Sequence, residues 1–324
     1  MGPDFVDGTG ALIVYTADAA KVDICFIHGL NGGRISTWKK GDVFWPYNLL
    51  PKDIKEARVI TWGYDADIAH FLAPLSANRV KDHAKNLLTA LRGVRDTPET
   101  SDRPIIFVTH SLGGIVCAQS LLPYASMESE ETQQIAKNTF GLAFMSTPFA
   151  GSETAEWARF FERLFAGSQF SVWLNSAKQS EDSIKNIRAM FFYEEMPTVA
   201  AGLVVSPNSS RINGWPSLAL HDNHAGICKF DNFEDPKYKQ VLPILKKWVD
   251  ELKPYHGKET SHYGDTIVSG KNYGGSQTGD DLSQGKMVRN QNTFVSSNGH
   301  EFQVRSHADG KSRLSTLKIK TTDN

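Results

Sequence analysis

The 324-residue sequence predicts an α/β protein with a mostly parallel central sheet and helices on both faces. Two observations support this fold class. Short apolar runs rich in β-branched and aromatic residues alternate with longer amphipathic segments between residues 10 and 253. Several of the short runs are apolar throughout, which is typical of strands that are buried on both faces.

The elements follow in order along the chain. Strands are expected at 11–15, 22–27, 57–62, 105–108, 141–146, 189–193 and 203–206. Helices are expected at 76–92, 115–122 and 238–252, where apolar residues recur at helical spacing. We expect residues 1–254 to form one domain, because the alternation of strands and helices stops there.

The last part of the chain, residues 255–324, has a different composition, dominated by Gly, Ser, Asn and Thr. The segment 264–270 shows a weak sequence similarity to the segment 279–285. Polar, glycine-rich repeats of this kind either stay disordered or stack as cross-β structure. We therefore predict a low-complexity tail that is disordered or amyloid-forming, and its composition alone favours a solvated chain.

Bulk properties exclude several classes of function. The net charge is −1, so we expect no nucleic-acid partner. The three cysteines cannot form a disulfide framework, and we find no signal peptide and no apolar run long enough to span a bilayer. We expect a cytoplasmic protein, with contact to a membrane surface left open.

A serine between a predicted strand and a predicted helix is the strongest chemical signal. Thr109-His110-Ser111-Leu112-Gly113-Gly114 follows the apolar run at 105–108. Small residues around a serine allow a sharp turn that lifts its hydroxyl above the sheet, as in the G-x-S-x-G motif, although Thr109 replaces the first glycine. Ser111 is the predicted nucleophile; the alternative is an ordinary strand-to-helix turn.

A second motif, His28-Gly29-Leu30-Asn31-Gly32-Gly33, follows the strand at 22–27. Glycines at this position let the backbone approach a substrate carbonyl. We predict that the amides of Leu30 and Leu112 receive the oxyanion. A plain strand-ending turn is the alternative for this motif.

The serine needs a base and an acid further along the chain. His224 is the predicted base, because a loop between the last predicted strand and the closing helix can carry it over the strand ends. His221 is the second candidate, and the remaining downstream histidines lie in or beside the tail. Glu194 is the predicted acid at the end of the strand 189–193; Glu195 remains an alternative, and Asp222 is a distant third.

Aromatic residues after Ser152 recur at near-helical spacing: Trp157, Phe160, Phe161, Leu164, Phe165 and Phe170. A core-facing helix explains them slightly better than a lid or an acyl-chain wall over Ser111. The second interpretation favours a lipid-like ester as the substrate.

Four motifs in order, at 27–32, 109–114, 145–152 and 222–230, make residues 10–252 resemble the α/β-hydrolases of the SERAC1-like and lipase-like serine esterase group. Phe192-Tyr193-Glu194 resembles a stretch of that group, which supports Glu194 as the acid. The resemblance implies an α/β-hydrolase fold, hydrolysis of carboxylic esters and no metal or organic cofactor.

The tail is similar in composition to the prion-forming repeats that end some fungal members of this group. That resemblance implies assembly of the tail with itself or with a receptor partner. A signalling or cell-death module with a secondary or vestigial hydrolase site is therefore the alternative function. A thioesterase or peptidase could use the same three residues.

Overall fold

The computed structural model describes residues 3–67, 76–97, 99–122, 130–149, 167–179, 187–198, 205, 207–252, 292–295 and 301–304. Contacts divide the chain into two units, Met1–Gly264 and Asp265–Asn324. Several sequence predictions lie outside the described residues. They are the strand at 203–206 apart from Val205, the aromatic residues at 157–165, and most of the tail.

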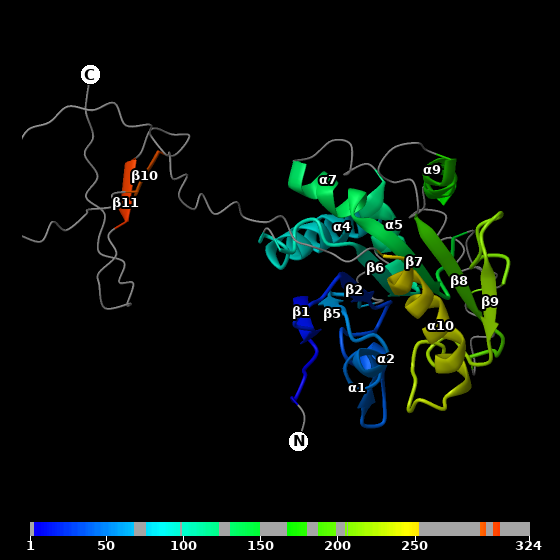
Figure 1. The fold of residues 1–324 in the computed structure, drawn as a ribbon. Coiled ribbons are helices and arrows are strands. Elements are labelled where there is room, and N and C mark those ends of the chain that lie inside the picture. Colours follow the sequence, from blue (N-terminus) through cyan, green and yellow to red (C-terminus); the bar gives the residue numbers. More distant parts are fainter. Residues whose placement is uncertain are drawn as a thin grey trace, which may run out of the picture. The chain divides into compact units, whose positions relative to one another are not determined.

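A seven-stranded sheet lies at the centre of the first unit (Figure 1). Its order is β1-β5-β2-β6-β7-β8-β9. β1 is antiparallel to β5, and each of the other neighbouring pairs is parallel. The strands are β1 (Gly10–Thr16), β2 (Val22–Ile27), β5 (Ala57–Gly63), β6 (Ile105–His110), β7 (Thr139–Met145), β8 (Arg188–Glu194) and β9 (Ser217–Leu220). A short pair, β3 (Lys39–Lys40) and β4 (Val43–Phe44), stands apart from this sheet.

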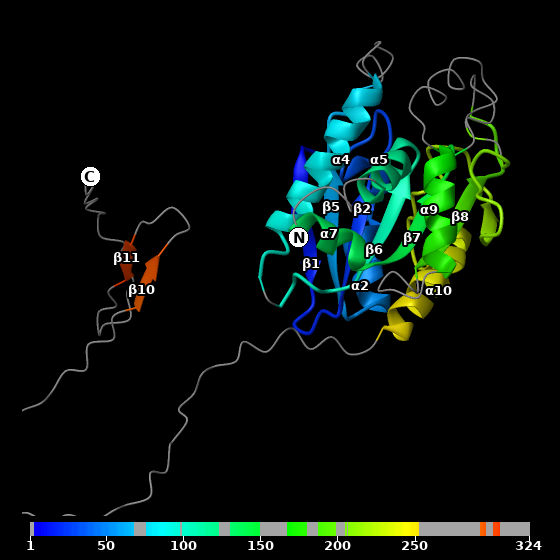
Figure 2. The ribbon, with the colours of Figure 1, turned by 90° about the horizontal axis from the view of Figure 1, so that it is seen from above.

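Helices cover both faces of the sheet. One face carries α4 (Ser76–Gly93), α5 (Leu112–Leu121), α7 (Glu130–Lys137) and α9 (Gly167–Gln179), which lie over the strands in Figure 2. The other carries α1 (Trp45–Asn48), α2 (Leu50–Asp53) and α10 (Pro236–Glu251), and the 3-10 turn η1 (Ser36–Trp38) adds to the same core. This layering and the strand order confirm the predicted fold class, and the fold is that of the α/β-hydrolases.

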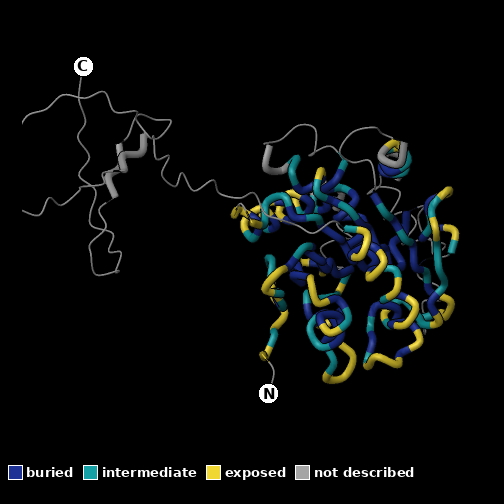
Figure 3. Tube along the Cα trace, in the orientation of Figure 1, coloured by how far each residue is buried: buried dark blue, intermediate teal, exposed yellow. Residues whose placement is uncertain are grey.

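Side-chain alternation along the strands explains the two layers. Cys25 and Phe107 point into one core, and their neighbours Phe26 and Val108 point into the other. All four residues are fully buried. The central strands β2, β5 and β6 are therefore dark along their whole length in Figure 3, whereas exposed residues lie on helices, on loops and on the outlying strands β1 and β3.

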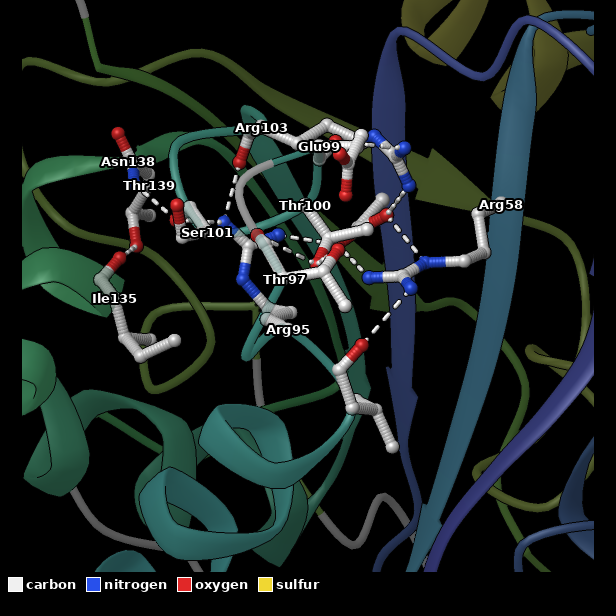
Figure 4. A network of polar contacts seen from close by, with 12 residues as sticks. Arg58, Arg95, Thr97, Glu99, Thr100, Ser101, Arg103, Ile135, Asn138 and Thr139 are labelled. Carbon is white, nitrogen blue, oxygen red and sulfur yellow. Dashed lines mark hydrogen bonds and ion pairs between the residues drawn. The ribbon is translucent and has the colours of Figure 1, made fainter. Parts of the chain in front are cut away.

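A buried charge cluster holds the amino ends of the central strands. Asp23 of β2 accepts hydrogen bonds from Arg58 (2.8 and 2.7 Å) and Arg103 (3.1 Å), and it is also bonded to Arg95. Figure 4 shows the arginines reaching backbone carbonyls of the loop before β6, among them those of Ser101 and Glu99. Because each buried charge has partners, the cluster ties this loop to the sheet and sets the start of β6.

β3 and β4 were not predicted, and two further differences from the sequence prediction concern strands of the first unit. β9 was not predicted, because Ser217-Leu218-Ala219-Leu220 is only four residues long; it forms by pairing with β8 at the sheet edge. Val205, the described residue of the predicted strand 203–206, lies in a bend.

The second unit contains one described antiparallel pair, β10 (Asn292–Val295) and β11 (Glu301–Val304), with Phe294 opposite Phe302. Across the described part of the whole chain, no helix combines the length and apolarity that crossing a bilayer would need.

Candidate active site

Ser111 occupies a sharp turn between β6 and α5. Its backbone has φ 52° and ψ −124°, a conformation that a non-glycine residue rarely adopts. The turn is held because the Ser111 amide donates to the carbonyl of Met145 (2.9 Å) and the Gly114 amide donates to the carbonyl of Ser111 (3.0 Å). Surrounding structure thus stabilises a strained backbone at the serine.

The packing of α5 explains which small residues the turn needs. A Cβ atom on Gly113 would lie 2.3 Å from the carbonyl oxygen of His28, so the helix packs directly on the neighbouring strand end. Thr109, where the usual motif has glycine, is still inside β6 and pairs with Ile27 and Phe144. A β-branched residue suits that position, because it belongs to the strand rather than to the turn.

His224 reaches Ser111 from the loop between β9 and α10. Its Nε2 lies 3.0 Å from Oγ of Ser111, although 113 residues separate the two in sequence. The side chain of His224 is 15% exposed, so the imidazole is largely shielded from water.

The loop that carries His224 is attached to the core at several points. Nζ of Lys237 donates to Oδ2 of Asp222 (2.5 Å) and to the carbonyls of Gly226 (2.8 Å) and Lys229 (2.9 Å). Nε1 of Trp45 donates to the carbonyl of Cys228 (2.9 Å). The loop is thereby positioned by contacts from two helices, α1 and α10.

Glu194, the last residue of β8, is fully buried beside His224. Its Oε2 lies 2.6 Å from Nδ1 of His224, and its Oε1 accepts a hydrogen bond from the amide of Val205 (3.2 Å). Glu195 points to the surface instead, where it lies 3.2 Å from Nδ1 of His221. Asp222, the third candidate acid, is engaged by Lys237 rather than by His224.

These contacts determine which ring nitrogen of His224 can accept a proton from Ser111. If Nδ1 of His224 carries hydrogen and donates to the Glu194 carboxylate, Nε2 has a free lone pair that faces the Ser111 hydroxyl. An arrangement of this kind can remove the hydroxyl proton and offset the resulting imidazolium charge.

The predicted oxyanion residues lie on two sides of Ser111. Leu112 is the first residue of α5, so its amide has no acceptor within the helix. Leu30 belongs to the loop after β2, which presses on the serine turn: a Cβ atom on Gly29 would lie 2.7 Å from Cβ of Ser111. The structure therefore brings both backbone segments to the turn at Ser111.

The side chain of His28 makes hydrogen bonds that hold the start of this loop. Its Nε2 accepts from the amide of Tyr64 (3.2 Å), which leaves Nδ1 to donate to the carbonyl of Gly29 (2.9 Å), and the Tyr64 hydroxyl donates to the His28 carbonyl (3.0 Å). Burial lowers the pKa of His28 to about 4. The neutral imidazole of His28 makes a hydrogen bond at each ring nitrogen and thereby supports the Leu30 loop.

Two side chains near His224 were not among the predicted site residues, namely His110 and Lys237. His110 was noted only as a neighbour of Ser111, and Nε2 of His110 lies 2.8 Å from the carbonyl oxygen of His224. Lys237 follows the helix-capping Asp235 and carries no sequence signal of its own. Neither contact could be read from local sequence, because both cross between distant elements.

Phe170 is the one described member of the predicted aromatic stretch. It is fully buried in α9 and packs on Phe149 (ring centroids 5.5 Å apart) and Phe144 (5.8 Å). Phe170 therefore faces the core. Within the described ranges, no group of three or more His, Cys, Asp or Glu side chains gathers as a metal site would require.

No family model matches this chain. Among curated proteins it is similar to Protein SERAC1 of Homo sapiens, with 27% identity over 265 residues that cover 72% of this chain and 40% of that protein. SERAC1 of Mus musculus is 28% identical over 280 residues, covering 76% of this chain and 42% of the relative. The chain spans about two fifths of the length of these relatives. This similarity and the fold together support an α/β-hydrolase-like group.

Solved structures with a similar fold include the mature lipase BlEst2 of Bacillus licheniformis, with a TM-score of 0.44 and 14% identity over 73% of this chain and 96% of that chain. A lipase-esterase related protein of Clostridium acetobutylicum has a TM-score of 0.43 and 10% identity, over 74% of this chain and 98% of that chain. The strand order and the turn at Ser111, rather than these modest likenesses, define the fold.

Proposed function

We propose that this protein is a serine hydrolase that cleaves carboxylic esters through a Ser111–His224–Glu194 triad. The proposal depends on one observation, the continuous set of contacts from Oγ of Ser111 to His224 (3.0 Å) and from His224 to Glu194 (2.6 Å). The strained turn at Ser111 and the full burial of Glu194 support it, because both are costly unless the surrounding structure maintains them.

The proposed reaction has two halves. Oγ of Ser111 attacks the ester carbonyl carbon while Nε2 of His224 takes the hydroxyl proton, and the amides of Leu30 and Leu112 receive the oxyanion. The intermediate collapses, the alkoxide leaves with the proton from His224, and Ser111 retains the acyl group. Water attacks this acyl-enzyme with His224 again as base, which releases the acid and restores Ser111. Loss of one oxyanion donor costs about 3–4 kcal/mol in comparable enzymes.

We further propose that the acyl group is lipid-like and that the protein contacts a membrane surface to reach it. The aromatic residues at 157–165 motivate this proposal, since they follow the strand that neighbours Ser111. Met196 adds support, because it is a large apolar residue that is 42% exposed. Its backbone amide donates to the carbonyl of Asp222, in the loop that carries His224.

The decisive experiment is labelling with a fluorophosphonate probe, followed by mapping of the modified residue. We expect modification of Ser111 in the parent protein and none in Ser111→Ala, with loss of ester hydrolysis by about 10⁶-fold. Ser101→Ala is a suitable control, because the hydrogen bonds of Ser101 in the described structure use its backbone amide and carbonyl. A parent protein that does not label at Ser111 contradicts the proposal.

A substrate series separates the related activities. Esters, thioesters and amides of matched acyl length should be compared in the parent protein, together with esters of increasing chain length. We expect the highest kcat/KM for long-chain esters. A preference for thioesters or amides would replace the ester assignment, and a preference for acetyl esters would remove the lipid-like acyl group.

A further inference from the structure

His110 makes a contact that the proposed triad does not use. It is the last residue of β6, directly before Ser111, and is 7% exposed. Its Nε2 lies 2.8 Å from the backbone oxygen of His224, and the two imidazole rings are 4.9 Å apart between centroids. One buried side chain thus joins the strand of the nucleophile to the loop of the base.

The direction of this bond is determined by chemistry. A carbonyl oxygen only accepts hydrogen bonds, so Nε2 of His110 must carry hydrogen and donate. Nδ1 of the same ring faces the Leu30 loop, where a Cβ atom on Gly29 would lie 3.2 Å away. The ring therefore lies where the nucleophile strand, the oxyanion loop and the base loop meet.

His110 stays neutral while the triad operates. Burial first, and the neighbouring His224 second, lower its pKa to about 3. The neutral ring keeps its Nε2–H donor for the carbonyl of His224. No positive charge on His110 opposes the imidazolium that forms on His224 during the reaction.

We propose that His110 is a positioning residue, which holds the main chain of His224 so that its imidazole meets Ser111. This inference rests on the proposed function. The bond fixes the backbone at the residue whose side chain must satisfy Ser111 and Glu194 at once, and small displacements of such a group are costly. A misplacement of about 1 Å can reduce a rate by about 100-fold.

Three variants of His110 distinguish a role in positioning His224 from a role in filling space. His110→Gln keeps an N–H donor near the position of Nε2, His110→Asn keeps polarity but is too short to reach the His224 carbonyl, and His110→Leu fills the space without a donor. The readouts are the rate of fluorophosphonate labelling at Ser111, kcat and KM for a p-nitrophenyl ester, and the pH profile of labelling. Thermal unfolding checks that each variant is folded.

We expect labelling and kcat to fall by about 10- to 100-fold in the leucine and asparagine variants, with little change in KM and an altered pH profile. The glutamine variant should recover most of the loss and keep the parental pH profile. Should the leucine variant fail to fold, the contrast between glutamine and asparagine carries the test.

Two results would overturn the inference while the proposed function stands: parental labelling rates in a folded asparagine variant, or an equal loss in the glutamine and asparagine variants with an unchanged pH profile. A parent protein that is never labelled at Ser111 overturns the proposed function, and this inference with it.

Discussion

Glu194 and His224 are joined at 2.6 Å between Oε2 and Nδ1, while the adjacent Glu195 lies at the surface, 3.2 Å from His221. Neighbouring residues at a strand end point to opposite sides, so only one carboxylate of the pair can face His224. The two histidines are similarly divided: the side chain of His224 is 15% exposed and that of His221 is 79% exposed.

Replacing Glu194 with Gln should reduce kcat by about 10³–10⁴-fold, because an amide can donate to Nδ1 of His224 and thereby favour the wrong tautomer. Glu195→Gln is the matched control and should leave kcat close to the parental value, since its partner is an exposed histidine. Steady-state hydrolysis of a p-nitrophenyl ester measures both. Equal losses in the two variants would argue against Glu194 as the acid.

Replacing Gly29 with Ala should slow labelling of Ser111 by about 100-fold. The new Cβ would lie 2.7 Å from Cβ of Ser111 and 3.0 Å from the carbonyl of His110, so the oxyanion loop and the nucleophile turn must move apart. Gly93→Ala is the control, because a Cβ atom there meets nothing within 4 Å. Parental labelling in Gly29→Ala would show that the loop is not required close to the serine.

Replacing Lys237 with Met should lower the free energy of unfolding by about 2–4 kcal/mol and slow labelling of Ser111. The methionine keeps the apolar stem but removes the ammonium from Asp222 and from two carbonyls of the His224 loop. Urea unfolding gives the stability, and labelling kinetics give the effect on the site.

Lys239→Met provides the comparison for Lys237. Lys239 is paired with Glu234, and both side chains are more than half exposed. Its replacement should change stability by less than about 0.5 kcal/mol. If the two methionine variants have the same stability and labelling rate, Lys237 does not position the loop.

Acid should destabilise the protein through its buried histidines. Burial lowers the pKa of His28 to about 4 and that of His110 to about 3, from 6.5 in an unfolded chain. Between pH 6.5 and pH 4 the unfolded state therefore binds more protons, so the free energy of unfolding decreases as the pH falls. Each histidine contributes about 2–3 kcal/mol to the loss between pH 7 and pH 4.5.

Urea unfolding at a series of pH values checks this expectation. His110→Gln should flatten the dependence in that window relative to the parent protein. The same slope in His110→Gln and in the parent protein would mean that His110 does not contribute to the acid sensitivity.

Much of the fold follows from local patterns. The all-apolar strand at 105–108 and the small residues around Ser111 predict a buried strand and a sharp turn from neighbouring residues alone. Periodicity likewise predicts the helices that correspond to α4 and α10. β9 escaped prediction because its four residues have a weak pattern and owe their conformation to pairing with β8.

The residues of the candidate site likewise include some that local sequence predicts and others that depend on contacts between distant elements. Sequence order and motif spacing favoured Ser111, His224 and Glu194, and they kept Glu195 and His221 open as alternatives. The register of β8 and the path of the His224 loop determine which carboxylate and which histidine face Ser111. Asp23 with its three arginines was not anticipated either, since its members come from β2, β5 and the loop before β6.

Local sequence predicts the alternation of strands and helices and the turn at Ser111 with the glycines beside it, because backbone preference and apolar periodicity act between near neighbours. Tertiary packing places Glu194 against the ring of His224, Lys237 against the loop that carries it and His110 against its backbone oxygen. Such contacts join residues from different elements, and hydrogen bonds form only where packing brings donor and acceptor within about 3 Å.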